Sequence, residues 1–359
     1  MKIREVITKK DKKDYIKFIY DIYRDDKNYC DMNITFVKNF LYKKDSYAKR
    51  CEVLPIFIED KEEIKLECMF IIDSSDEIKL SFLEFKKNGK KYLKELIKYS
   101  KKLLKQYDKK KVIVGVNGQV SYGLGFLTNE YNREFEFNSN YNPDYYTKEM
   151  DAVFPVIKKA FSYNYKATNS LSFFDQKILD YVYENYEFRY FDMKHFKRDM
   201  LKFGELCHKS LKGTPYYSKK TPQEMYELMK QVKFIMKKED IIFAMKDGKE
   251  VGYVYTHPDY AELFDRPKLN YVKFFFRYLF KKTHNVIYNV IGVLPEHQLS
   301  GLAIALIHKS ILMRQEKYPY GVSSFILEDN VPSTKICRKL STGINKEYHL
   351  YEISGDDSV

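Results

Sequence analysis

The sequence predicts an α+β (mixed α/β) fold of two lobes, each a mostly antiparallel mixed sheet flanked by helices. Strand-like and helix-like patterns follow in the same order in both halves of the chain. The length of 359 residues also favours two domains over one. The expected division is a first lobe at residues 1–149, a helical connector at 150–185 and a second lobe at 186–359.

The opening segments of the two halves align without a gap. A predicted strand at 2–7 and amphipathic helix at 11–24 correspond to a strand at 187–192 and a helix at 194–210. The shared residues are Arg4 with Arg189, Lys12 with Lys197, Asp14 with Asp199, Lys17 with Lys202, and Phe18 with Phe203. This agreement indicates an internal duplication.

The rest of the first half repeats a strand, strand, strand, helix, strand order. The predicted strands are 54–58, 66–72, 78–85 and 111–116, and the helix is 90–107. The connection before this helix is rich in lysine and turns at Asn88-Gly89. It lacks small residues that would admit a phosphate, so we expect a degenerate copy without a cofactor. The connector should contain two helical segments, the first including Ala152 to Phe161.

The second half contains clearer signals for helix starts and turns. Thr221-Pro222 predicts a helix start, with Glu224 completing the cap, and the helix should run to about Met236. Asp247-Gly248 predicts a hairpin between strands within 240–255. Further strands are expected at 286–293, 321–328 and 344–353, with helices from Gly301 and from Asn330 to about Leu340.

The most informative stretch joins the strand ending before Pro295 to the helix that follows Gly301. The first turn of a helix presents unpaired N–H groups with the helix dipole behind them, which suits an anionic phosphate. Gly301 and Ala303 would let a phosphate approach the backbone. An ordinary strand–turn–helix would give the same pattern.

The residues Gln298-x-x-Gly301-x-Ala303 resemble the acetyl-CoA pyrophosphate loop of the GNAT acyltransferases, Gln/Arg-x-x-Gly-x-Gly/Ala. The whole chain resembles bacterial two-lobed GNAT-like proteins, with a Gly-Leu-Gly-Phe-Leu loop at 123–127 and Tyr-Asn-Pro-Asp-Tyr-Tyr at 141–146. The resemblance implies acetyl-CoA as acyl donor, bound by the second lobe. The residues it assigns to the cofactor are Ile291, Val293, Gln298, Leu299, Ser300, Gly301, Leu302, Ala303, Asn330 and Ser333.

The catalytic groups are less defined. The resemblance places the usual tyrosine acid seven residues after Asn330, where this chain has Cys337. A tyrosine on the last strand, Tyr348 or Tyr351, could serve instead. Glu328 is the leading candidate for the base. Glu296, His297, His257 and Asp259 are the other titratable groups nearby, and no metal site is expected.

Composition limits the class of protein. The net charge of +13 permits nucleic-acid binding, but the lysines are spread along every segment, and this disfavours it. Five scattered cysteines without metal-ligand spacing favour a reducing, cytoplasmic location. No apolar run approaches the length of a membrane span, and no signal peptide is visible.

One aromatic and basic segment, 267–282, allows three interpretations. It could be a lid over an acyl or amine pocket, an interfacial membrane helix, or a helix packed in the core with solvated basic residues. The sequence favours the helix packed in the core.

Together these features predict an acyl-CoA-dependent N-acyltransferase that acetylates a primary amine of a small molecule or peptide. An aminoacyl-tRNA-dependent transferase of the tandem-lobe type is one alternative, since the basic charge suits tRNA. A non-enzymatic CoA-binding protein is the other, because Cys337 stands where the acid is usual. The acceptor, the acyl chain length and the oligomeric state are left open.

Overall fold

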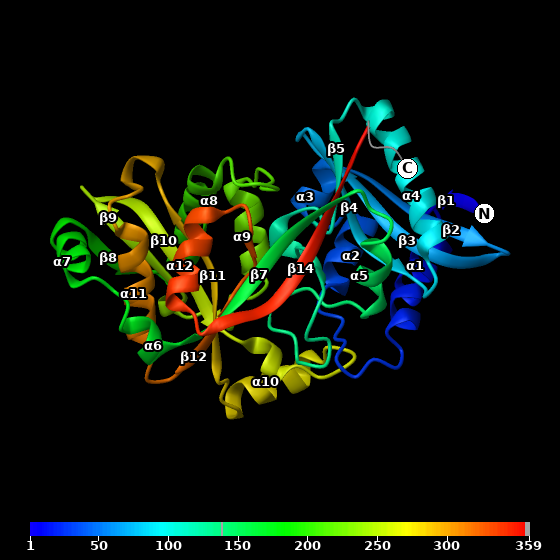
Figure 1. The fold of residues 1–359 in the computed structure, drawn as a ribbon. Helices are drawn as coiled ribbons and strands as arrows, with labels where there is room; N and C mark the ends of the chain where they lie inside the picture. The colour runs from blue at the N-terminus through cyan, green and yellow to red at the C-terminus, as the bar shows by residue number, and fades with distance from the viewer. Residues whose placement is uncertain (138, 356–359) are drawn as a thin grey trace. The chain divides into compact units, whose positions relative to one another are not determined.

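The computed structural model describes residues 1–137 and 139–355, which form two compact units (Figure 1). Unit 1 contains Met1–Phe161, Leu263–Phe280 and the described residues from Lys346 onward. Unit 2 contains Ser162–Glu262 and Lys281–Asn345. Each unit therefore takes segments from distant parts of the sequence. The predicted domain boundaries remain predictions.

Unit 1 is built on a sheet with the strand order β1-β2-β3-β4-β5-β14, in which β2, β3 and β4 lie side by side (Figure 1). The first four strands are antiparallel neighbours, and β5 runs parallel to β4 after the α4 crossover. Its elements are β1 (Lys2–Glu5), α1 (Lys9–Ile22), α2 (Ile34–Leu41), α3 (Ser46–Arg50), β2 (Glu52–Asp60), β3 (Glu63–Ile72), β4 (Glu77–Phe85), α4 (Lys90–Tyr107), β5 (Lys111–Val114), η1 (Val120–Tyr122), β6 (Phe126–Leu127), α5 (Tyr145–Met150) and α10 (Tyr271–Phe280).

Unit 2 repeats this plan with the order β7-β12-β11-β10-β9-β8. The β9–β10 hairpin turns at Asp247-Gly248 as predicted, and β11 continues it before α11 crosses to the parallel strand β12. Its elements are α6 (Ala167–Leu171), α7 (Gln176–Asn185), β8 (Glu187–Tyr190), α8 (Phe196–Leu211), α9 (Pro222–Lys230), η2 (Lys238–Asp240), β9 (Ile241–Lys246), β10 (Lys249–Pro258), η3 (Tyr260–Leu263), β11 (Asn285–Val293), η4 (Pro295–His297), α11 (Leu302–Arg314), β12 (Tyr320–Ser323), β13 (Ile326–Leu327) and α12 (Val331–Leu340).

Several local predictions are confirmed and some are wrong at their ends. Thr221 and Glu224 form the predicted capping box at the start of α9, but this helix ends at Lys230 rather than near Met236. The single strand predicted at 321–328 is two short strands, β12 and β13. The break matters, because β13 pairs with β7 instead of continuing along β11.

Two long strands, β7 (Val156–Lys166) and β14 (Gly343–Ser354), run through both units. In unit 2, the end of β7 pairs antiparallel with β12, with Tyr165 opposite Gly321. In unit 1, the end of β14 pairs antiparallel with β5, with Tyr351 opposite Val114. Each sheet is thus completed by a strand from the other half of the sequence.

The helix predicted to include Ala152 to Phe161 is therefore wrong, because most of that stretch belongs to β7. The strand alternates between exposed and half-buried residues at 156–159 and is then buried on both faces at 160–163. Burial on both faces gives a continuous apolar run, which periodicity cannot distinguish from a buried helix.

The duplication is visible in the packing of the two units. Arg4 on β1 donates to Asp11 at 2.6 Å and to Glu59 at 2.8 Å. Arg189 on β8 donates to Asp199 at 2.6 Å and to Glu250 at 2.7 Å. The arginines correspond as the sequence indicated. Asp199, which binds Arg189, is equivalent to Asp11, which binds Arg4, and not to Asp14 as the ungapped alignment predicted. The alignment therefore does not extend into the helix.

Candidate acyl-CoA site

The sheet of unit 2 opens between β11 and β12. The two strands pair in parallel from Asn285 with Tyr320 to Tyr288 with Ser323. The last hydrogen bonds between this part of the chain and β11 come from Ser324. Its N–H donates to Tyr288 O at 2.9 Å, and its hydroxyl donates to Asn289 O at 2.5 Å. Asn289 is also the extra residue at a β-bulge against β10. Beyond this point the chain turns into β13, so β11 continues with an edge that β12 no longer covers.

The hydrogen bonds between β11 and β10 show which main-chain groups of β11 point toward the opening. The N–H of Leu294 donates to Val251 O, so Leu294 and every second residue before it face β10. Ile291 and Val293 consequently direct their main-chain groups toward the opening. Gln298 uses its side-chain amide to donate to Val293 O at 3.2 Å, which ties the next loop to this edge.

That loop carries two left-handed residues, Leu299 with φ of 63° and Gly301 with φ of 84°. Ser300 stabilises it by donating its hydroxyl to His297 O at 2.8 Å and accepting the N–H of Leu302 at 3.3 Å. Within the described residues 1–137 and 139–355, the N–H groups of Leu299, Gly301, Ala303 and Ile304 form no hydrogen bond. These four donors at the start of α11 fit an anionic phosphate.

The side chains of the loop have different roles. Leu299 is fully exposed, whereas Leu302 is fully buried in the core between α7, β9, β10 and β11. A Cβ on Gly301 would lie 2.5 Å from Ile178 Cγ2 of α7. Its left-handed backbone and this contact require glycine at position 301 whether or not a phosphate binds.

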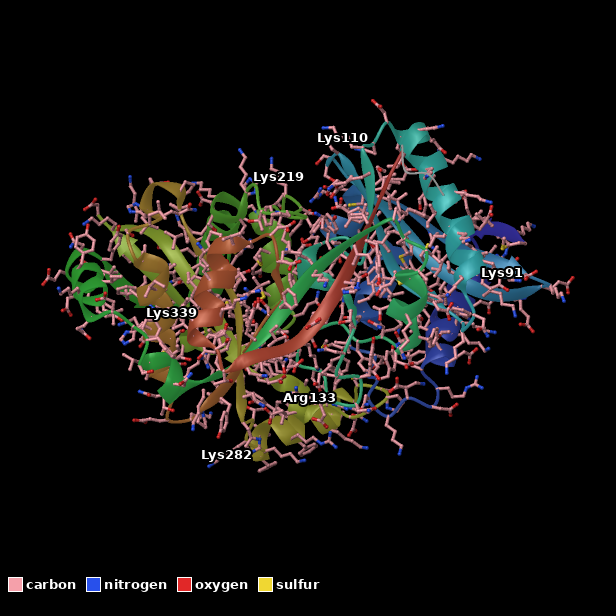
Figure 2. The ribbon with its side chains drawn as sticks, viewed as in Figure 1. Lys91, Lys110, Arg133, Lys219, Lys282 and Lys339 are labelled. Atoms are coloured by element: carbon pink, nitrogen blue, oxygen red, sulfur yellow. The ribbon has the colours of Figure 1, made fainter. Side chains whose placement is uncertain are left out.

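α12 lies after the opening and begins with a side-chain cap. The side chain of Asn330 accepts the N–H of Ser333 at 3.3 Å, so Asn330 is the N-cap that the sequence allowed. The hydroxyl of Thr334, one turn on, is buried without a hydrogen-bond partner among the described residues. Lys335, Arg338 and Lys339 are exposed on the same helix, and Figure 2 labels Lys339. Their charge suits an acidic cofactor.

Cys337, the residue in place of the usual acid, is half-buried on α12. The hydroxyl of Tyr165, at the end of β7, interacts with this thiol and with the Ser323 hydroxyl. Burial raises the pKa of the Tyr165 phenol well above its usual range, and burial also raises the pKa of the Cys337 thiol. Tyr165 was missed from the sequence, because it lies in the stretch next to the wrongly predicted helix and no motif marks it.

The other candidate residues are placed separately. Glu328 is exposed between β13 and α12. Tyr348 is buried on β14 in unit 1, opposite Leu127 and packed against Gly125, so it belongs to the other unit from the loop of Gly301. His257 is buried on β10, where its Nδ1 lies 2.9 Å from Pro258 O and its Nε2 lies 3.4 Å from the Asn289 amide. Burial lowers the pKa of His257 to about 4.

The corresponding helix start in unit 1 is occupied by the protein itself. The carboxylate of Glu149 accepts the N–H of Asn88 at 2.8 Å and of Gly89 at 2.5 Å, just before α4. A side-chain anion therefore satisfies in unit 1 the kind of donors that remain unpaired in unit 2.

No group of three or more His, Cys, Asp or Glu side chains that could hold a metal ion occurs among the residues described. None of the described helices is both long and apolar enough to cross a membrane.

Comparison with known proteins identifies the fold. No family model matches the chain, and no curated protein matches it. Among solved structures, a tandem GNAT protein from the clavulanic acid biosynthesis pathway is similar over 100% of both chains, with 9% identity and a TM-score of 0.52. A GCN5-related glucosamine N-acetyltransferase region of a fungal multi-domain β-N-acetylglucosaminidase is similar over 98% of this chain and 38% of its own, with 10% identity and a TM-score of 0.55.

At these identities the likeness establishes the fold alone. The fold is that of the GNAT acetyltransferases in its tandem, two-lobed form.

Proposed function

We propose that this protein is an acyl-CoA-dependent N-acyltransferase that transfers an acetyl group from acetyl-CoA to a primary amine. One observation carries the proposal. In unit 2, the opening between β11 and β12 leads to a helix start whose N–H groups lack acceptors in the described chain. The fold neighbours named as acetyltransferases support the same reaction class.

The chain has groups suited to each part of the cofactor. The N–H donors from Leu299 to Ile304 would bind the pyrophosphate, with Gln298 and Ser300 holding the loop in shape. The main-chain groups of Ile291 and Val293 would pair with the pantetheine amides, as a strand edge pairs with an extended ligand. Asn330, Ser333 and the buried hydroxyl of Thr334 offer further polar contacts from α12. Acetyl-CoA supplies an acyl group activated as a thioester.

Three proton transfers must accompany acetyl transfer: the acceptor nitrogen loses two protons and the leaving thiolate gains one. A base takes a proton from the ammonium of the acceptor, so that the nitrogen lone pair can form the amide bond as the carbon–sulfur bond breaks. Glu328 is proposed as this base. Tyr165 is proposed as the acid, in place of the tyrosine that Cys337 replaces, because its hydroxyl interacts with the Cys337 thiol and so lies beside that position. Its hydroxyl would give a proton to the leaving thiolate, and the resulting phenolate would take the second proton from the nitrogen of the new amide.

We also propose a cytoplasmic location. All five cysteines are free, and four of them are buried. Free thiols persist in reducing compartments.

The test uses a matched pair of substitutions at Ser300. Asp at this position would place a carboxylate among the N–H donors, as Glu149 does in unit 1. Asp and Asn have nearly the same shape, and the side chain of either can accept the N–H of Leu302 as Ser300 does, so Ser300→Asp and Ser300→Asn should fold alike. We expect Ser300→Asp to weaken acetyl-CoA binding at least about tenfold, since a charge at a helix N-terminus opposes an anionic ligand. Ser300→Asn should bind nearly as the wild type does.

Binding is measured by calorimetric titration with acetyl-CoA, CoA and a tRNA pool, and transfer by release of free thiol with a panel of amines. Acetyl-CoA binding that Ser300→Asp leaves unchanged would reject the loop as the phosphate site. If tRNA binds and acetyl-CoA does not, the aminoacyl-transfer alternative replaces the proposal. Acetyl-CoA binding without turnover of any amine would favour the non-enzymatic alternative.

A further inference from the structure

The helix α10 is held on unit 1 although its sequence lies between β10 and β11 of unit 2. The segment before it is anchored at Asp31, whose N–H donates to Pro267 O at 3.0 Å and whose carboxylate accepts the N–H of Leu269 at 2.8 Å. Phe264 packs on Phe137 in the same unit. These contacts fix the position from which α10 starts.

One face of α10 is apolar and exposed. Its six large side chains are each between 48% and 81% exposed: Tyr271, Val272, Phe275, Phe276, Leu279 and Phe280. At 3.6 residues per turn, these positions occupy one continuous half of the helix surface. The other half carries Phe274, which is buried, and Arg277, which pairs with Asp265. The expectation that this segment packs in the core is therefore wrong for most of its apolar side chains.

The charged residues of α10 and those that directly follow it are all positive. Residues 266–282 contain six lysines and arginines and no acidic residue. Lys273 and Arg277 are engaged with Asp265, and Arg266 lies 3.6 Å from Glu134. Lys281 and Lys282 follow the last turn, are exposed, and form no ion pair in the described chain (Figure 2 labels Lys282).

From this arrangement we propose that α10 is an interfacial helix that binds the surface of an anionic lipid membrane. Its apolar half enters the boundary between headgroups and acyl chains, and Lys281 and Lys282 contact lipid phosphates. Ten residues are too few to span a bilayer but enough to lie in its interface. Phe and Tyr suit that boundary, and the net charge of +13 favours an anionic surface.

A protein partner would bury such a face equally well, but the charges favour lipid. Residues 266–282 contain no acidic residue, and the apolar half of α10 is followed by two lysines that form no ion pair in the described chain, whereas protein interfaces commonly carry a polar rim of complementary groups. A second copy of this chain would bring the same positive charges together.

The test is co-sedimentation of the full chain with vesicles of phosphatidylcholine alone or mixed with phosphatidylglycerol, without acetyl-CoA. We expect binding to the anionic vesicles only, weakened by salt. Phe275→Ser with Phe280→Ser should reduce the bound fraction at least about tenfold, because two apolar side chains no longer leave water. Lys281→Gln with Lys282→Gln should weaken binding about fivefold per lysine and reduce its salt dependence.

The matched control replaces two exposed phenylalanines of unit 2, Phe173→Ser with Phe234→Ser. Its vesicle binding should equal that of the wild type, and circular dichroism should be unchanged in all variants. Absence of binding to anionic vesicles overturns the proposal. So does a dimer in solution that Phe275→Ser with Phe280→Ser dissociates while vesicle binding is unaffected. Because no cofactor is present, the result is independent of acyl transfer.

Discussion

A carboxyl pair in unit 1 should contribute a loss of stability as pH rises. Glu84 on β4 lies opposite Glu67 on β3; the Glu67 side chain is fully buried and Glu84 is half-buried. Glu84 accepts hydrogen bonds from Tyr146 at 2.5 Å and from Tyr23 at 3.3 Å. Neither oxygen of Glu67 has a partner among the described residues. The buried phenol of Tyr15 and the buried thiol of Cys68 also interact with Glu67.

Burial raises the pKa of Glu84 from its ordinary value of 4.5 to about 7, and it raises the pKa of Glu67 well above its usual range. The native state therefore holds a proton that the unfolded state releases. Stability from Glu84 is complete below pH 4.5 and is lost as pH rises through about 7. The full loss of unfolding free energy is about 3 kcal/mol, because a shift of one pKa unit corresponds to about 1.4 kcal/mol.

The assay is urea unfolding of the wild type and of Glu84→Gln from about pH 5 to 8, followed by circular dichroism. Gln keeps an acceptor for Tyr146 but does not ionise. We expect the wild type to lose roughly 2–3 kcal/mol more than Glu84→Gln across this range. Glu67 is present in both proteins, and because burial is the main cause of its raised pKa, most of its contribution cancels in the comparison. Glu184→Gln, an exposed site in unit 2, should leave the pH dependence unchanged.

Equal pH slopes in the wild type and Glu84→Gln would refute this reasoning. A wild type that loses less stability than Glu84→Gln would refute it as well, because groups with the opposite pH dependence, such as the buried His257, are present in both proteins.

Three further predictions concern the two helix starts and the proposed acid. Glu149→Gln should destabilise unit 1 by about 1–2 kcal/mol in urea unfolding, because it removes a charge from two N–H donors. An unchanged midpoint would contradict this. Tyr165→Phe should lower the rate of acetyl transfer by about 10²-fold or more while the Kd for acetyl-CoA stays constant; Cys337→Ser should have a smaller effect, and the reverse ranking would exclude Tyr165. Gly301→Ala should lose at least about 1–2 kcal/mol of stability from its left-handed backbone, and Ile178→Ala should recover only the part due to the steric contact. Full recovery of stability in the double variant would mean that the left-handed backbone at position 301 does not destabilise alanine.

The sequence determined the features that depend on neighbouring residues. The capping box at Thr221, the Asp247-Gly248 hairpin and the strand–turn–helix around Gly301 were all predictable, because turn geometry, caps and periodicity are set within a few residues. The repeated strand–helix units and the matching of Arg4 with Arg189 were visible for the same reason.

Only the tertiary structure decided which distant segments meet. The pairing of β7 with β12 brings Tyr165 to Cys337, and Glu149 reaches the start of α4 from a separate helix. The sequence pattern of β7 does not indicate which strand it pairs with, since the same apolar run fits any buried position in a sheet. The amphipathic pattern of α10 likewise does not state whether its apolar face is covered. Such features arise from contacts between residues far apart in the chain, and local sequence patterns do not predict these contacts.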